Sequence, residues 1–210
     1  MKYSLTVLAA ALTLSGVSTT FAASSVDLTV KGLITPSACT PTLSGGGIVD
    51  HGKIAVQDLH PSLETKLPDV TVQLTIDCEA STLVAIKSTD NRAGTSSQWG
   101  GGSSTFGLGL AAGKKVGWYA LTMINATADD TPRTVIESVD GSTWFDAPAG
   151  TIWQPDWMRS LASGAELNPV PMQRFRSDVV ISTVLNYKRE LPLTEEFAID
   201  GNATLDVVYL

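Results

Sequence analysis

The two cysteines are the residues whose chemistry the sequence constrains most. Cys39 and Cys78 are the only cysteines in the chain of 210 residues. In an exported protein, an even count of cysteines indicates a disulfide. Closing a loop of this length stabilises a fold by about 4 kcal/mol in the chain-entropy model. The histidines near them, His51 and His60, do not complete the spacing of a zinc site. We therefore expect a structural disulfide and no metal.

The remaining polar residues do not form a catalytic pattern. Two histidines limit the acid–base chemistry that is available, and neither a Gly-x-Ser-x-Gly nor a His-Glu-x-x-His motif is present. Asp129-Asp130 and Glu195-Glu196 are adjacent pairs, and adjacent side chains on a strand point to opposite faces. The glycine run Gly100–Gly102 lacks the lysine and the helix of a phosphate-binding loop. We expect no enzymatic activity and no cofactor.

The first residues have the pattern of a signal peptide. Lys2 provides a positive charge, Leu5 to Leu14 form an apolar run, and Thr20-Phe21-Ala22 offers small residues for cleavage. The apolar run is far shorter than the roughly 20 residues of a membrane helix. The sequence thus predicts a signal peptide over residues 1–22, export through the periplasm, and no membrane insertion.

The mature chain is acidic and has the size of one domain. Residues 23–210 number 210 − 22 = 188, and without Lys2 they carry 13 basic and 21 acidic residues, a net charge of −8. The basic residues do not cluster, which argues against nucleic acid as a partner.

Short alternating runs between turn signals predict an all-β, antiparallel sandwich. The expected strands are Val26–Ile34, Gly52–Val56, Val70–Cys78, Leu83–Ser88, Val116–Met123, Arg133–Glu137, Asp178–Tyr187 and Ala203–Leu210.

Residues 91–171 are expected to form a long insertion with a short helix near Pro155–Ser163. This stretch contains all five tryptophans. They could form an exposed patch that binds a ligand, or they could pack the core and cover a long connection, which we favour.

Both ends of the mature chain alternate in polarity. Residues 23–35 precede the first cysteine, and alternate positions are occupied by Val26, Leu28, Val30, Gly32 and Ile34, with mostly polar residues between them. Such a segment is either an ordinary first strand or a strand lent to a neighbouring molecule. The last strand alternates in the same way at Ala203, Leu205, Val207 and Tyr209. A final strand has an available edge unless another strand pairs with it, and such edges bind added strands.

Four segments carry a resemblance to the pilins of the chaperone–usher pathway. Val30–Ala38 resembles a donor strand with its glycine ahead of the first cysteine, and Ile48–Ile54 resembles the pilin segment that follows, with His51 where a leucine usually stands. Val72–Cys78 resembles the strand with the partner cysteine, and Gly201–Leu210 resembles the C-terminus with its penultimate tyrosine. Length and the long middle region bring the chain closer to a fimbrial-like family known only as a domain of unknown function.

The resemblance implies a fold, a mechanism and partners. Residues 36–210 would be an immunoglobulin-like sandwich that lacks its last strand, filled first by a periplasmic chaperone and then, at an outer-membrane usher, by the extension of the next subunit. Val26, Leu28, Val30 and Ile34 would be the donor anchors, Gly32 would lie where the acceptor leaves no room, and Tyr209 with its alternating companions would line the acceptor edge. The protein would be a structural subunit of a fimbrium at the cell surface, with a role in adhesion. Main-chain pairing on both sides of the donor would set its register.

Two alternatives stay open. The N-terminal segment could fold back and complete its own sandwich, which would make the protein a secreted binding module. The chain could also be a tip adhesin with a sugar site among the tryptophans, although tip adhesins usually carry a lectin domain in place of a donor strand.

Overall fold

The structure is a computed structural model that describes residues 28–31, 38–100 and 102–210. The chain divides into two units, Met1–Ile34 and Thr35–Leu210. Residues 28–31 of the first unit have no regular secondary structure. The predicted signal peptide, residues 1–22, lies outside the described residues.

The described part of the second unit is almost entirely antiparallel strand, as the sequence predicts. Its regular elements are β1 (Cys39–Leu43), η1 (Ser44–Gly47), η2 (Val56–Asp58), β2 (Thr65–Lys66), β3 (Val70–Thr82), β4 (Val84–Asp90), β5 (Phe106–Gly107), β6 (Leu110–Ala111), β7 (Lys114–Lys115), β8 (Gly117–Ala128), β9 (Thr131–Pro132), β10 (Thr134–Ser138), β11 (Phe145–Asp146), β12 (Ile152–Trp153), β13 (Met158–Ala162), β14 (Met172–Leu185), η3 (Lys188–Glu190) and β15 (Ala203–Tyr209). The η elements are single 3-10 turns.

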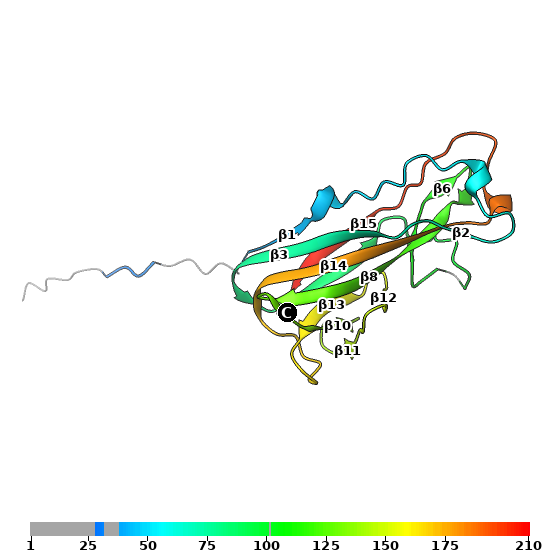
Figure 1. The fold of residues 1–210 in the computed structure, drawn as a ribbon. Helices are drawn as coiled ribbons and strands as arrows, with labels where there is room; N and C mark the ends of the chain where they lie inside the picture. The colour runs from blue at the N-terminus through cyan, green and yellow to red at the C-terminus, as the bar shows by residue number, and fades with distance from the viewer. Residues whose placement is uncertain (1–27, 32–37, 101) are drawn as a thin grey trace, which may run out of the picture. The chain divides into compact units, whose positions relative to one another are not determined.

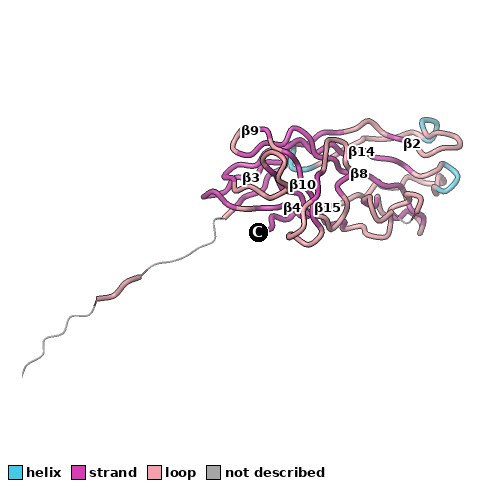
Figure 2. The backbone as a smooth tube through the Cα atoms, turned by 90° about the horizontal axis from the view of Figure 1, so that it is seen from below, coloured by secondary structure: helices cyan, strands magenta, loops and turns pink. Residues whose placement is uncertain are grey.

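Two main sheets form the layers of a sandwich. The first has the order β1-β3-β14-β8-β12, with β2, β5 and β9 paired beside this path, and the second has the order β11-β10-β13-β4-β15. Figure 1 shows β1, β3, β14 and β8 side by side, with β15 in the layer behind them. In Figure 2 the strands make up most of the domain, and β4 and β15 are neighbours. The arrangement is the immunoglobulin-like sandwich that the sequence predicts.

Alternation along the long strands builds the core between the layers. In β3, Val72, Leu74 and Ile76 are buried, whereas the residues between them are more exposed. Side chains from β8, β14 and the second sheet complete this core, which contains Trp153 and Phe175. A smaller apolar cluster around Ile136, Trp144 and Met158 also forms, with Val208 of β15 packed against it. Because this cluster covers alternate residues of β13, all five residues of that strand are buried.

One lateral side of the sandwich is closed by the chain itself. β11 pairs with β10 of the second sheet, and β12, a few residues later, pairs with β8 of the first sheet. Residues 145–153 thus cross from one layer to the other. The opposite lateral side is bounded by β1 and β15, the end strands of their sheets.

Three local expectations are wrong. The described part of the expected strand Val26–Ile34, residues 28–31, has no regular secondary structure. Residues Pro155–Ser163 form a turn followed by β13, because the segment pairs with β10 and β4 and this pairing overrides the local preference for a helix. Residues 52–55 are irregular and are followed by η2, so no strand lies at Gly52–Val56. Residues 91–171, expected as an insertion, contribute β8, β10 and β13 to the two sheets.

Candidate functional site

The disulfide holds β1 against β3 at one end of the sandwich. Cys39 and Cys78 are directly opposite in the antiparallel register of these strands and form the expected disulfide. β1 is therefore covalently fixed as the outer strand of the first sheet.

β15 is the outer strand of the second sheet, and its alternation is the one that the sequence predicts. Ala203, Leu205 and Val207 pack against the main core, whereas Thr204 and Asp206 are exposed. The ring of Tyr209 is partly exposed, and its hydroxyl accepts a hydrogen bond of 2.9 Å from the backbone N–H of Cys39. Tyr209 thus links the end of β15 to the start of β1.

The backbone of β15 is paired on one side only within the described residues. It runs antiparallel to β4 from Ala203 opposite Asp90 to Tyr209 opposite Val84. The N–H of Leu210 donates to Leu83, and the N–H of Asn91 donates to Asn202. Because bonded pairs alternate in an antiparallel ladder, the even-numbered residues face β4. The N–H and C=O groups of Ala203, Leu205 and Val207 therefore point to the free edge.

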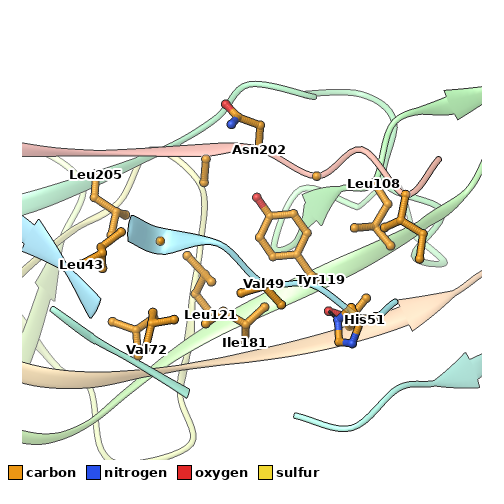
Figure 3. Close-up of a pocket in the computed structure, with 16 residues that line it drawn as sticks. Leu43, Val49, His51, Val72, Leu108, Tyr119, Leu121, Ile181, Asn202 and Leu205 are labelled. Atoms are coloured by element: carbon orange, nitrogen blue, oxygen red, sulfur yellow. Dashed lines mark hydrogen bonds between the residues drawn. The ribbon is translucent and has the colours of Figure 1, made fainter. Parts of the chain in front are cut away.

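A mostly apolar cavity of about 180 Å³ lies between β1 and β15. Leu43 and Val49 line it from the β1 side, and Leu205 lines it from β15. Figure 3 shows the ring of Tyr119 rising from the floor of this cavity toward the strand that carries Asn202. His51 is a polar residue in the lining, and its Nε2 lies 3.0 Å from the hydroxyl of Thr183.

A second cavity, of about 220 Å³, shares a lining residue with the first. Ile199 lines both cavities, and Gly52 of the second directly follows His51 of the first. The second cavity is mostly aliphatic, with Lys53, Glu195 and Glu196 among its lining residues. We call the two cavities together the lateral groove. Its walls are residues 43–59 on one side and 191–205 on the other, and these walls run in opposite directions.

The stretch after β4 anchors the wall that leads into β15. The guanidinium of Arg92 donates two hydrogen bonds of 2.8 Å to the carboxylate of Asp200. Asn91 donates from its side-chain amide to Asn202 and Thr204, and the backbone N–H of Asp200 donates to Leu108. These contacts hold the start of β15 although its outer edge has no partner strand in the described chain.

The charges of Arg92 and Asp200 stabilise each other. The hydrogen bond from Arg92 lowers the pKa of Asp200, and the same contact raises the pKa of Arg92. Beside them, burial raises the pKa of Tyr119, so its hydroxyl stays neutral at physiological pH. The groove floor thus carries no charge at Tyr119.

The described part of the predicted donor segment is exposed. Leu28 and Val30 expose 89% and 87% of their surfaces. Val26, Gly32 and Ile34 lie outside the described residues. The structure therefore brings together the acceptor-edge residues and the disulfide, and it leaves the donor residues unplaced relative to them.

Leu108 and Tyr119 also line the groove, although the sequence did not indicate them. An added Cβ on Gly201 would come within 2.9 Å of both side chains, so the backbone at the start of β15 lies directly on them. Alternation could not have indicated that Tyr119 points inward, because Tyr119, Ala120 and Leu121 are all buried.

The tryptophans do not form a common surface patch. Trp144 and Trp153 are buried, Trp118 and Trp157 are half-buried, and Trp99 is 98% exposed. The expectation that these rings pack the core is confirmed for Trp144 and Trp153 and is wrong for Trp99.

Comparison with known proteins finds one family model and two relatives from Escherichia coli. Residues 28–117 match the family described as "Protein of unknown function (DUF1120)". The chain is similar to "Protein GltF" of Escherichia coli (strain K12), with 29% identity over 88% of each chain. It is also similar to "Uncharacterized protein YhcF" of the same strain, with 27% identity over 90% of this chain and 92% of the relative. The similarity is thus to a family of unknown function.

Proposed function

We propose that the protein is a structural subunit of a fimbrium that assembles by donor-strand exchange. The lateral groove is the acceptor site, and residues 23–35 of another subunit are the donor strand. The observation that carries this proposal is the free edge of β15 beside the apolar groove. In the proposed pathway, a periplasmic chaperone fills the groove first, and an outer-membrane usher exchanges it for the next subunit. The protein would act at the cell surface, in adhesion, and without enzymatic activity or cofactor.

The chemistry of the groove suits an extended apolar strand. The free edge offers N–H and C=O groups at every second residue of β15, and an added strand satisfies such groups. Leu43, Leu121 and Leu205 line the space into which alternate side chains of that strand would point. Exposed strand edges otherwise favour uncontrolled pairing, so a permanently free edge supports a use in assembly.

The donor segment suits the groove in its pattern of apolar residues. Leu28 and Val30 lie two residues apart and are almost fully exposed, so both side chains are available to another surface. Four aliphatic anchors contribute about 1.5–3 kcal/mol each when buried, or roughly 6–12 kcal/mol before the cost of ordering the segment.

The test is a pair of aspartate substitutions on the two faces of the donor segment. Leu28→Asp places a charge in the groove, whereas Thr29→Asp, the matched control, places it on the solvent side. We expect Leu28→Asp, and likewise Gly32→Leu, to lose fibre or oligomer formation while the chain still folds with its chaperone. Light scattering after size-exclusion chromatography measures assembly, and disulfide content and circular dichroism measure folding. Unchanged assembly by Leu28→Asp and Gly32→Leu would overturn the donor role.

A further inference from the structure

We propose that the loop between β4 and β5 binds a neutral sugar, which stacks on the ring of Trp99 and accepts hydrogen bonds from two glutamine amides. The described part of this loop is residues 91–100 and 102–105. None of these described residues lines the lateral groove. The inference therefore goes beyond the proposed function and does not depend on strand exchange.

The loop lies at the end of β4 that is away from the disulfide. β4 runs from Val84, which is opposite Tyr209, to Asp90, which is opposite Ala203. The hydroxyl of Tyr209 is in turn bonded to the backbone of Cys39. Loops at the ends of an immunoglobulin-like sandwich commonly carry binding residues, because the strands hold the two ends of each loop in place. The position of this loop thus suits a binding surface.

The composition of the loop is that of a binding loop. Residues 95–105 consist of serine, threonine and glycine together with Gln98 and Trp99, and they include no charged residue. In antibody binding loops, small polar residues provide adaptable hydrogen bonds, and a tryptophan provides a large, rigid contact area. Trp99 exposes 98% of its surface, so its ring is accessible to a ligand.

Hydrogen bonds inside the loop fix the amide of Gln98. The hydroxyl of Thr105 donates to Oε1 of Gln98 at 3.0 Å, and the hydroxyl oxygens of Ser96 and Thr105 lie 2.8 Å apart. Because a hydroxyl has one hydrogen, Ser96 is the donor of this second bond. Ser96 and Thr105 are both buried. Oε1 of Gln98 is therefore held by the loop, and its Nε2 has no bonded partner among the described residues.

Gln154, between β12 and β13, offers a second amide. Its Oε1 accepts a hydrogen bond of 3.2 Å from the hydroxyl of Ser104, and its backbone carbonyl accepts one of 2.9 Å from the buried Ser88. Its Nε2 likewise has no bonded partner in the part of the chain that the structure describes. Because Ser104 and Thr105 are consecutive, both amides belong to one short stretch of surface beside Trp99.

The charged groups bonded to the loop balance each other. The carboxylate of Asp90 accepts a hydrogen bond from the backbone N–H of Arg92, whose side chain pairs with Asp200. Nζ of Lys115 donates to the carbonyl of Ser96 at 2.8 Å. Two cations thus stand against two carboxylates. This balance favours a neutral ligand over a phosphate or an acidic sugar.

A neutral sugar uses both kinds of group that the loop presents. The C–H groups on one face of a pyranose carry partial positive charge and pack on the negative face of an indole ring. The sugar hydroxyl oxygens accept hydrogen bonds from amide N–H groups. Trp99 is the single large apolar side chain in residues 95–105, and an acyl chain offers no acceptor to the amides. The loop therefore suits a sugar better than a lipid.

The test is binding of the mature chain to an array of neutral oligosaccharides built from hexose and N-acetylhexosamine units. Acidic oligosaccharides on the same array and vesicles of phosphatidylcholine with phosphatidylglycerol test the other ligand classes. We expect the chain to retain neutral oligosaccharides and neither of the other two. Titration calorimetry with the best-retained oligosaccharide then gives the affinity that the variants are compared with.

Substitutions of Trp99 test the stacking contact. We expect Trp99→Ala to weaken binding by at least about tenfold, the factor that 1.4 kcal/mol supplies, and Trp99→Phe to retain part of the affinity. Phe145→Ala, which removes a half-exposed ring of β11, is the control and is expected to bind as the parent chain does. Because Trp99 is exposed, the circular dichroism of Trp99→Ala should stay native.

Substitutions of the glutamines test the amide donors. Gln98→Glu and Gln154→Glu keep an oxygen for the hydroxyls of Thr105 and Ser104 but remove the outward N–H groups. We expect each to weaken binding by about tenfold, because a buried hydrogen bond to the ligand is lost. Gln173→Glu makes the same chemical change at the start of β14, where the amide donates to Glu79, and should leave the affinity unchanged.

Each outcome has a defined meaning. Binding of a neutral oligosaccharide that weakens in Trp99→Ala and in both glutamine variants supports the inference. Retention of acidic oligosaccharides or vesicles alone, of no probe at all, or of the same oligosaccharides by Trp99→Ala overturns it. Unchanged affinity in both glutamine variants overturns it as well. Light scattering of Trp99→Ala should show unchanged assembly, so failure of this inference is distinct from failure of the proposed function.

Discussion

At the scale of single residues, Arg159 is the most deeply buried charged residue in the described part of the chain. Its side chain has no exposure, and its Nη2 lies 3.2 Å from the carboxylate of Glu137, which is 10% exposed. The same Nη2 donates to the carbonyl of Thr151 at 2.8 Å, and the guanidinium lies over the ring of Trp153. Burial lowers the pKa of Arg159, and Glu137 opposes that shift. This residue ties the segment that closes one lateral side to the second sheet.

Breaking this buried pair should destabilise the sandwich strongly. We expect Arg159→Ala to lower the free energy of unfolding by about 3–5 kcal/mol, because Glu137 is left buried without its partner. The double variant Arg159→Met/Glu137→Leu removes both charges and is expected to cost much less. Urea unfolding followed by tryptophan fluorescence measures both. Equal losses in the single and double variants would contradict this account.

A second prediction at this scale concerns pH. The backbone N–H groups of Thr143 and then Ser142 lower the pKa of Asp140 to about 2. A carboxyl group with a lower pKa in the folded state stabilises the fold above its unfolded-state pKa, and this contribution disappears as the pH falls through the folded-state value. We expect the difference in Tm between the parent chain and Asp140→Asn to be constant above about pH 5 and to shrink toward pH 2. A difference that stays constant down to pH 2 would contradict the assignment.

At the scale of elements, side chains from the stretch after β4 hold the residues that immediately precede β15. Arg92 and Asn91 bind Asp200 and Asn202 immediately before the strand begins. A strand with one free edge needs such an anchor, because half of its backbone groups contribute no ladder bonds. The residues after β4 thus help to keep the groove open and shaped.

Removing this anchor should loosen the groove wall without unfolding the domain. We expect Arg92→Gln to accelerate amide hydrogen exchange at Asp200, whose N–H is bonded to Leu108, while amides of β3 and β14 keep their protection. Arg189→Gln is the control, because Arg189 pairs with the neighbouring Glu190 away from β15. Mass spectrometry with short peptides measures the exchange. Equal exchange in the two variants at Asp200 would show that Arg92 has no anchoring role.

At the scale of the whole molecule, the two lateral sides of the sandwich differ. Residues 145–153 cross between the sheets on one side, whereas β1 and β15 leave an apolar groove between them on the other. Under the proposed function, a further strand fills the open side. Assembly and stability are therefore expected to be coupled in this protein.

Deletion of residues 23–35 tests this coupling directly. We expect the shortened chain to keep the strands of unit Thr35–Leu210 but to lose assembly, and to bind a synthetic peptide of residues 23–35 in its open groove. Binding should raise Tm in proportion to the logarithm of the peptide concentration above its Kd. Light scattering and thermal unfolding measure the two effects. Full assembly by the shortened chain would contradict the coupling.

Features that depend on the alternation of neighbouring residues could be predicted from the sequence. Alternating polarity located β3, β4, β8, β10, β14 and β15, because the side chains of a strand change face at every residue. The cysteine count predicted the disulfide, since the two cysteines of a chain that is expected to be exported have one possible pairing. The inward set Ala203, Leu205 and Val207 followed from the same alternation.

Features that depend on distant contacts could not be predicted in this way. Residues 158–162 pair with one strand on each side, β10 and β4. They therefore form β13 where the local sequence favoured a helix. Leu108 and Tyr119 reach the groove because Gly201 lies directly against them, a contact between segments more than 80 positions apart. The free edge of β15 and the bond between Tyr209 and Cys39 likewise depend on which strands end each sheet. Alternation assigns a side chain to a face, but only packing between the layers decides what that face meets.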